Sequence, residues 1–192
     1  SSGVTRCLPH TPCRGVAESM KNIVLIGFMG TGKTSVGRLL AGRLGCAFHD
    51  LDKKIEEACG ISIPQMFAQH GEPYFRAREK EAVRAAAARS GLVIATGGGT
   101  VKDAENAAIL RENGVLVALT ADVDTILQRT AARGARPVLD GADAGDRRAA
   151  VVQLLEERRT LYAGADITVD TSRRSPLEVA EYIVQATRIW RK

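Results

Sequence analysis

The sequence predicts an α/β fold in which helices cover both faces of one parallel sheet. Short aliphatic runs such as Ile23-Val24-Leu25-Ile26 are continuous rather than alternating, which is typical of strands buried on both faces. Segments with helical periodicity separate these runs, and this alternation is the pattern of a parallel sheet. The chain has 192 residues, of which 45% are hydrophobic, so one domain with one core is expected.

Five segments are expected to be strands because they are short, aliphatic and bounded by polar residues or glycine. They cover residues 23–26, 47–49, 92–95, 115–119 and 167–169. The second runs into acidic residues, and the third runs into three glycines. These two strand ends are therefore candidates for a functional site.

Helices are expected between the strands, and several carry a start signal. The first has an apolar stripe formed by Val36, Leu39, Leu40 and Leu44. Ser62-Ile63-Pro64-Gln65 is a capping box that predicts a helix ending at Gly71, and Ser175-Pro176-Leu177-Glu178 predicts the start of the last helix. The remaining expected helices span residues 52–59, 72–90, 103–113, 122–133 and about 148–162.

Two segments do not fit the alternation of strands and helices. Residues 1–20 lack periodicity and the apolar segment of a secretory signal, so we interpret them as a disordered leader of added or upstream residues before a native start at Met20. The predicted domain then covers residues 21–192. Within it, residues 134–147 are rich in glycine and charge and too long for a plain turn, so a mobile lid is expected there.

The composition excludes several classes of protein. The net charge is +5, which fits either a polyanionic partner or a phosphate site. Aromatic residues make up only 4%, which disfavours a base-stacking surface for nucleic acids. No apolar stretch approaches the ~20 residues of a membrane helix. The four cysteines lack CxxC spacing, which favours a reducing, cytoplasmic location.

The segment Gly27-Phe28-Met29-Gly30-Thr31-Gly32-Lys33-Thr34 matches the phosphate-binding loop, or P-loop, G-x-x-x-x-G-K-[ST]. It leaves a predicted buried strand and opens a predicted helix, as this motif requires. Glycines let backbone N–H groups approach a phosphate, and the Lys33 ammonium can reach the β- and γ-phosphates. The Thr34 hydroxyl can bind Mg²⁺. The sequence therefore predicts a nucleoside triphosphate and Mg²⁺ as ligands.

Asp50 and Asp52 follow the second predicted strand, and the carboxyl ends of parallel strands face the ligand crevice. One carboxylate can hold the water shell of the metal, and the other can accept a hydrogen bond from an attacking hydroxyl. The alternative is that either residue merely caps the next helix.

Two further groups of residues are candidates for ligand binding. Glu72, Arg76 and Glu79 share one helix face and can aim the Arg76 guanidinium at a carboxylate, although a solvated ion-pair face is the alternative. Gly97 to Gly99 could let a ligand approach the backbone or could form an ordinary turn.

Arginines after residue 128 complete the candidate set. Arg129, Arg133 and Arg136 flank the expected lid and could stabilise charge on a transferred phosphoryl group; a solvated surface loop is the alternative. Arg158 is either a second anion-binding arginine or part of an exposed helix end.

Taken together, the order P-loop, D-x-D, F-R-x-x-E, G-G-G, R-P-V-L and R-x-x-L-Y resembles the shikimate kinases from Lys21 to the C-terminus. The resemblance implies the three-layer P-loop kinase fold of the nucleoside-monophosphate-kinase type, with a five-stranded parallel sheet and a lid. It implies ATP-dependent phosphorylation of the 3-hydroxyl of shikimate, which gives shikimate 3-phosphate and ADP on the route to chorismate and the aromatic amino acids. Two positions depart from the pattern, Val138 after Arg136-Pro137 and Arg159-Thr160 after Arg158.

The same resemblance implies a role for each matching position. ATP would be bound by Gly30, Thr31, Gly32, Lys33, Thr34, Ser35, Arg129, Arg136, Arg174 and Pro176. Shikimate would be bound by Asp52, Arg76, Gly97, Gly98, Gly99 and Arg158. Thr34 and Asp50 would hold Mg²⁺, and Lys33, Asp52 and Arg136 would be catalytic, with Asp52 as the candidate base.

Alternative functions remain at this point. One is another P-loop kinase of small metabolites, such as a gluconate kinase, and a less favoured one is an inactive nucleotide-binding homologue. The expected partners are ATP and shikimate, with no nucleic acid and no membrane, and a monomer is expected.

Overall fold

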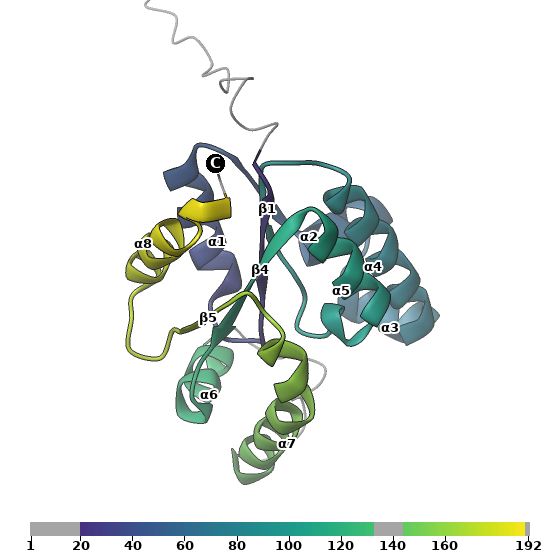
Figure 1. The fold of residues 1–192 in the computed structure, drawn as a ribbon. Helices are drawn as coiled ribbons and strands as arrows, with labels where there is room; N and C mark the ends of the chain where they lie inside the picture. The colour runs from purple at the N-terminus through teal and green to yellow at the C-terminus, as the bar shows by residue number, and fades with distance from the viewer. Residues whose placement is uncertain (1–19, 133–143, 191–192) are drawn as a thin grey trace, which may run out of the picture.

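The computed structural model describes residues 20–132 and 144–190. These residues form a five-stranded parallel sheet with the strand order β2-β3-β1-β4-β5 (Figure 1). The strands are β1 (Asn22–Ile26), β2 (Ala47–Asp50), β3 (Leu92–Ala95), β4 (Gly114–Thr120) and β5 (Ile167–Asp170). Each expected strand is confirmed, and no observed end differs from the expected one by more than one residue.

The helices follow the expected alternation. They are α1 (Lys33–Leu44), α2 (Leu51–Cys59), α3 (Ile63–His70), α4 (Glu72–Ala87), α5 (Ala104–Glu112), α6 (Val123–Ala131), α7 (Ala144–Ala163) and α8 (Pro176–Ala186), with short 3-10 helices η2 (Thr100–Lys102) and η3 (Arg188–Trp190). The Ser62 capping box of α3 is confirmed, because the Ser62 and Gln65 side chains bond to each other's backbone N–H groups.

Helix α4 ends at Ala87, three residues before the expected end at residue 90. The carbonyl of Arg89 accepts hydrogen bonds from the side-chain amides of Asn22 (2.7 Å) and Asn113 (3.1 Å). The Gly91 N–H donates to the carbonyl of Met20 at 2.8 Å. These bonds tie the chain to the start of β1, so the helix cannot continue.

Helix α7 begins at Ala144, so residues 144–147 of the expected lid belong to a helix. The rest of that segment, 134–143, lies outside the described residues, as does the expected leader up to residue 19. None of the described helices is long and apolar enough to cross a membrane.

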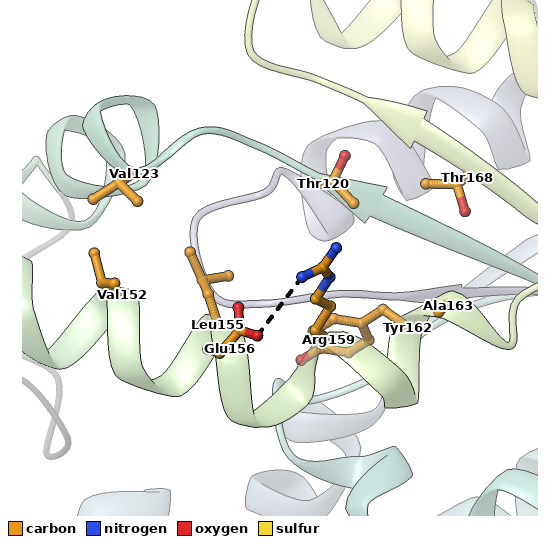
Figure 2. A pocket seen from close by; sticks show the side chains of 9 residues that line it. All are labelled: Thr120, Val123, Val152, Leu155, Glu156, Arg159, Tyr162, Ala163 and Thr168. Carbon is orange, nitrogen blue, oxygen red and sulfur yellow. Dashed lines mark ion pairs between the residues drawn. The ribbon is translucent and has the colours of Figure 1, made fainter.

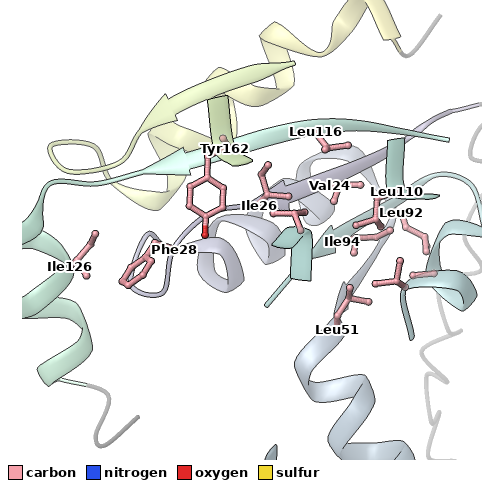
Figure 3. Close-up of a cluster of buried hydrophobic side chains, with 14 of the residues drawn as sticks. Val24, Ile26, Phe28, Leu51, Leu92, Ile94, Leu110, Leu116, Ile126 and Tyr162 are labelled. Atoms are coloured by element: carbon pink, nitrogen blue, oxygen red, sulfur yellow. The ribbon is translucent and has the colours of Figure 1, made fainter. Parts of the chain in front are cut away.

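Alternate residues of the central strands face opposite layers of helices. Val24 and Ile26 of β1 join one core cluster with side chains from α2, α4, α5 and α7 (Figure 3). Ile23 and Leu25 join a second cluster with α1 and α8, which lie on the other face of the sheet (Figure 1). The three-layer architecture therefore follows from strands that are apolar on both faces.

The apolar stripe expected on α1 is wrong in one position. Val36 and Leu40 are buried and Leu44 is partly buried, but Leu39 is 39% exposed. The helix instead buries Gly37 and Ala41, because these small residues allow it to lie close to the sheet and to α8.

The sheet register brings the expected functional segments to one edge. Asp50 at the end of β2 pairs with Ala95 of β3, and Ala95 pairs with Leu25 of β1. The P-loop follows β1 and the three glycines follow β3, so both leave the same carboxyl edge as Asp50. That edge is where a ligand crevice is expected.

Candidate active site

The P-loop joins β1 to α1 in a conformation that needs glycine. Gly27, Gly30 and Gly32 have φ values of 147°, 78° and 96°. A Cβ atom on Gly27 would collide with the carbonyl oxygen of Leu119. Gly32 is the N-cap of α1 and provides no side-chain cap, so the first N–H groups of the helix lie open to an anionic ligand.

Lys33 folds back over this loop. Its ammonium donates to the carbonyl oxygens of Gly27 at 2.6 Å and Phe28 at 2.8 Å. The charge is thereby held beside the loop rather than extended into solvent. An ammonium in this place can reach a phosphate group, if one is bound by the N–H groups of the loop, as in other P-loops.

Thr34 and Asp50 are brought together from α1 and β2. The Thr34 hydroxyl donates to the Asp50 carboxylate at 3.1 Å. The same carboxylate caps α2 by accepting a bond from the Lys53 N–H at 3.4 Å. Asp50 therefore has the capping role as well as a position beside the P-loop. Hydroxyl and carboxylate oxygens are ligands of the type that Mg²⁺ prefers.

Asp52 lies on the first turn of α2 and points to a different neighbour. A Cβ atom on Gly97 would lie 2.8 Å from Oδ1 of Asp52. Because Gly97 has no side chain, the Asp52 carboxylate fits against the turn formed by Gly97, Gly98 and Gly99, which we call the glycine turn. The two aspartates of the D-x-D motif therefore contact different segments: Asp50 contacts the start of α1, and Asp52 contacts the glycine turn.

Arg76 of α4 is held by two glutamates. Its Nη1 donates to Glu79 at 2.8 Å and its Nε donates to Glu72 at 3.3 Å. Burial opposes the charge, but the hydrogen bonds to Glu79 and Glu72 outweigh it and raise the pKa of the Arg76 guanidinium. A Cβ on Gly99 would lie 3.0 Å from Nη2, so the glycine turn also makes room for this arginine.

Glu79 is buried, with 2% of its surface exposed, so the alternative of a solvated ion-pair face fits only Glu72. Its second carboxylate oxygen accepts a bond from the Thr100 hydroxyl at 2.9 Å, and Asn106 donates to the Thr100 carbonyl at 3.1 Å. Thr100 and Asn106 were not among the residues predicted for the site. Their only signal in the sequence is that both are polar residues close to the glycine turn.

Arg158 approaches the same turn from α7. Its Nη1 donates to the Gly98 carbonyl at 3.0 Å, and its guanidinium carbon lies 5.3 Å from the centre of the Phe28 ring. The Arg158 side chain is largely buried, which excludes the alternative of an exposed helix end. The hydroxyl of Tyr162 donates to the same carbonyl at 2.9 Å. Tyr162 ends the R-x-x-L-Y motif, but the sequence had assigned it no role in the site.

A hollow of about 210 Å³ lies beside the P-loop between α1 and α8. It is lined by Thr31, Gly32, Ser35, Val36, Arg129, Thr171, Arg174, Pro176 and Val179. Three of the residues expected to bind ATP, Arg129, Arg174 and Pro176, lie here. Arg129 is fixed by hydrogen bonds to the carbonyls of Gly30 (3.2 Å) and Thr171 (2.8 Å).

A larger hollow of about 450 Å³ opens between α6, α7 and the ends of β4 and β5 (Figure 2). An ion pair between Glu156 and Arg159 lies at its edge, and the ring of Tyr162 forms part of its wall. No residue expected in the site lines this hollow. The expected lid arginine, Arg136, lies outside the described residues.

The comparisons with known proteins agree on one family. A family model described as shikimate kinase matches residues 29–188. The chain belongs to the shikimate kinase family. A shikimate kinase of Geobacter metallireducens is 47% identical over 166 residues, which cover 86% of this chain and 91% of the relative. A shikimate kinase of Pelotomaculum thermopropionicum is 48% identical, and the match covers 86% of this chain and 94% of that relative.

Solved structures of the family share the fold. The shikimate kinase from Acinetobacter baumannii in complex with shikimate superposes with a TM-score of 0.82 at 38% identity, over 88% of this chain and 93% of that chain. The structure from Aquifex aeolicus gives a TM-score of 0.72 at 32% identity. The P-loop kinase fold implied by the sequence motifs is therefore confirmed.

Proposed function

We propose that this chain transfers the terminal phosphoryl group of ATP to the 3-hydroxyl of shikimate, giving shikimate 3-phosphate and ADP. The observation that carries the proposal is that the guanidinium groups of Arg76 and Arg158 converge on one glycine turn beside the P-loop. A Cβ on Gly98 would lie 3.3 Å from Arg158 Nη1 and 3.6 Å from the backbone nitrogen of Met29. A nucleotide hydrolase needs no such second anion site, whereas a kinase of a carboxylated alcohol does.

In this mechanism the nucleotide is bound mainly by the P-loop side of the crevice. The N–H groups of residues 30–35 and the Lys33 ammonium bind the phosphates, and Arg129, Arg174 and Pro176 flank the adenine. Arg136 is proposed to contact the phosphates. Thr34 directly and Asp50 through water would hold Mg²⁺, which neutralises phosphate charge when bound.

The acceptor is bound on the opposite side. Arg76 and Arg158 bind the carboxylate of shikimate, with Gly97, Gly98 and Gly99 beside them. The Asp52 carboxylate accepts the proton of the 3-hydroxyl of shikimate while the oxygen of that hydroxyl attacks the γ-phosphorus. Phosphoryl transfer depends largely on placement and charge stabilisation, so fixing both reactants is the main contribution of the protein. The product then feeds the synthesis of chorismate and the aromatic amino acids.

The test of this proposal is ADP release with shikimate as the only acceptor. We expect turnover with shikimate and Mg²⁺, none when EDTA removes the metal, and at least 100-fold lower kcat/KM with gluconate, which lacks the ring that would place a hydroxyl near Asp52. Comparable turnover of gluconate would favour the alternative kinase, and ATP binding without turnover of either acid would favour the inactive homologue.

The carboxylate clamp gives a second prediction. Replacing Arg76 with lysine keeps the charge but loses the planar fork, so the Kd for shikimate should rise roughly 10- to 100-fold, the scale of one or two charge-assisted hydrogen bonds. Because Arg76 does not contact the P-loop hollow, the Kd for ADP should stay within twofold in calorimetric titrations.

The matched control is Arg84→Lys, also on α4, where an exposed arginine pairs with Glu105 at 2.5 Å. It should leave both affinities unchanged, since an exposed ion pair contributes little. Weakened nucleotide binding with intact shikimate binding in Arg76→Lys would contradict the assignment of Arg76 to the acid.

We also propose that the protein acts as a cytoplasmic monomer. The described cysteines, Cys46 and Cys59, are not joined in a disulfide, which is compatible with a reducing compartment. Light scattering should give a mass near 20.5 kDa, and a dimer mass would contradict the proposed state. Cell fractionation should place the activity in the cytosol, and activity confined to another fraction would contradict the location.

A further inference from the structure

The carbonyl of Gly98 accepts hydrogen bonds from two donors on one helix. Arg158 and Tyr162 lie one turn apart on α7, and their donor atoms are 3.0 Å and 2.9 Å from the same oxygen. Each of the two residues has only 8% of its surface exposed. An oxygen held by two buried donors has one defined orientation, so the Gly98–Gly99 peptide plane is locked.

The orientation of this peptide determines what the glycine turn offers to a ligand. None of the described peptide bonds is cis, so the Gly98 carbonyl and the Gly99 N–H point in opposite directions. The carbonyl points to α7, and the N–H therefore points away from α7. The Arg76 guanidinium lies close to the same residue, since a Cβ on Gly99 would be 3.0 Å from its Nη2. Within the described residues, the Gly99 N–H donates to no protein acceptor, whereas the next N–H, that of Thr100, bonds to the Gly97 carbonyl at 3.3 Å.

The two donors on α7 differ in their freedom. Arg158 forms no ion pair with a carboxylate in the described part of the chain, so its remaining N–H groups can bind a ligand. Tyr162 has one hydroxyl proton, which goes to Gly98, and its ring packs in the core cluster with Phe28 (Figure 3). Burial raises the pKa of the Tyr162 hydroxyl, against the opposing effect of Arg158, so it remains a donor at neutral pH.

We propose that Tyr162 is a positioning residue for recognition of the acid. Its hydroxyl, with Arg158, holds the Gly98 carbonyl against α7 and so presents the Gly99 N–H to the substrate carboxylate as a third donor beside Arg76 and Arg158. A glycine peptide without this anchor rotates easily, because glycine has no Cβ to restrict it. This inference rests on the proposed function, since it assumes that shikimate binds at the glycine turn.

The test is Tyr162→Phe, which removes one oxygen and keeps the ring. We expect the Kd for shikimate to rise about 3- to 10-fold, the scale of one neutral hydrogen bond, with the Kd for ADP and kcat at saturating shikimate within twofold. The preference for shikimate over its neutral carboxamide should fall by the same factor. Tyr74→Phe on α4, where the ring stacks on His70, is the matched control and should change none of these values.

Several outcomes would overturn the proposal. Unchanged shikimate affinity in Tyr162→Phe would do so. An equal loss of affinity for shikimate and for its carboxamide would also overturn it, as would a parallel loss of nucleotide affinity, which indicates a general structural role. A second measurement needs no variant. In the wild-type protein, shikimate should move the Gly99 amide proton resonance downfield more than the carboxamide does, and equal shifts would refute the role of the N–H. If wild-type protein neither binds nor phosphorylates shikimate, the proposed function itself fails, which is a separate result.

Discussion

Replacing Lys33 with methionine is expected to lower kcat at least 100-fold. The ammonium lies over the P-loop through its bonds to the Gly27 and Phe28 carbonyls, where it would meet the β- and γ-phosphates of ATP. One preorganised charge at a site of developing charge accounts for a loss of this size. Methionine matches the apolar stem of lysine and lacks only the ammonium group, so the loss can be assigned to the charge.

Steady-state turnover with saturating ATP and shikimate is the measurement, with the thermal midpoint as a check of folding. Lys54→Met serves as the control, because Lys54 is an exposed residue of α2 that pairs with Glu57. Unchanged turnover in Lys33→Met would remove Lys33 from the mechanism. A lower thermal midpoint with normal turnover would limit its role to holding the P-loop carbonyls.

The second large effect is expected for Asp52→Asn, with kcat reduced about 100- to 10,000-fold, the range attributed to general bases. Asparagine keeps the shape that fits against Gly97 but does not accept the hydroxyl proton. The Kd for shikimate should change by less than tenfold, because the amide still hydrogen-bonds the substrate hydroxyls. Pre-steady-state measurement of phosphoryl transfer gives the chemical step directly.

Asp50→Asn is the informative comparison, since Asp50 lies next to the motif but bonds to Thr34 instead. We expect its lost activity to recover as the Mg²⁺ concentration is raised, whereas that of Asp52→Asn should not. A loss below fivefold in Asp52→Asn would show that transfer proceeds without a base. Recovery of Asp52→Asn by Mg²⁺ would instead assign Asp52 to the metal.

Local sequence features were sufficient to predict the sheet and the start of the site. The three central strands β1, β3 and β4 are apolar on both faces, so continuous aliphatic runs such as residues 92–95 predicted them almost to the residue. The P-loop was predictable because its chemistry is local, with glycines, lysine and threonine all acting within one strand–turn–helix unit. The capping box at Ser62 likewise acts within four residues.

The errors arose where distant contacts overrule local pattern. The end of α4 depends on Asn22 and Asn113, which are far from it in the sequence. The exposure of Leu39 depends on which side of α1 meets the sheet and α8. The predicted apolar stripe contains only four residues, and their spacing does not show which of two neighbouring faces of the helix is buried.

The amino-acid sequence by itself determined the alternation of strands and helices, the phosphate loop and the family, because each rests on residues close together in the chain or on motifs in a recognisable order. Only the tertiary structure decided that Asp50 meets Thr34 and that Asp52 lies against Gly97. It also decided that Glu79 joins Arg76 to Thr100 and that Tyr162 bonds to the Gly98 carbonyl. Apart from the one between Arg76 and Glu79, these contacts join segments from 16 to 64 residues apart, and only the packing of the helices around the carboxyl ends of the parallel strands sets their distances.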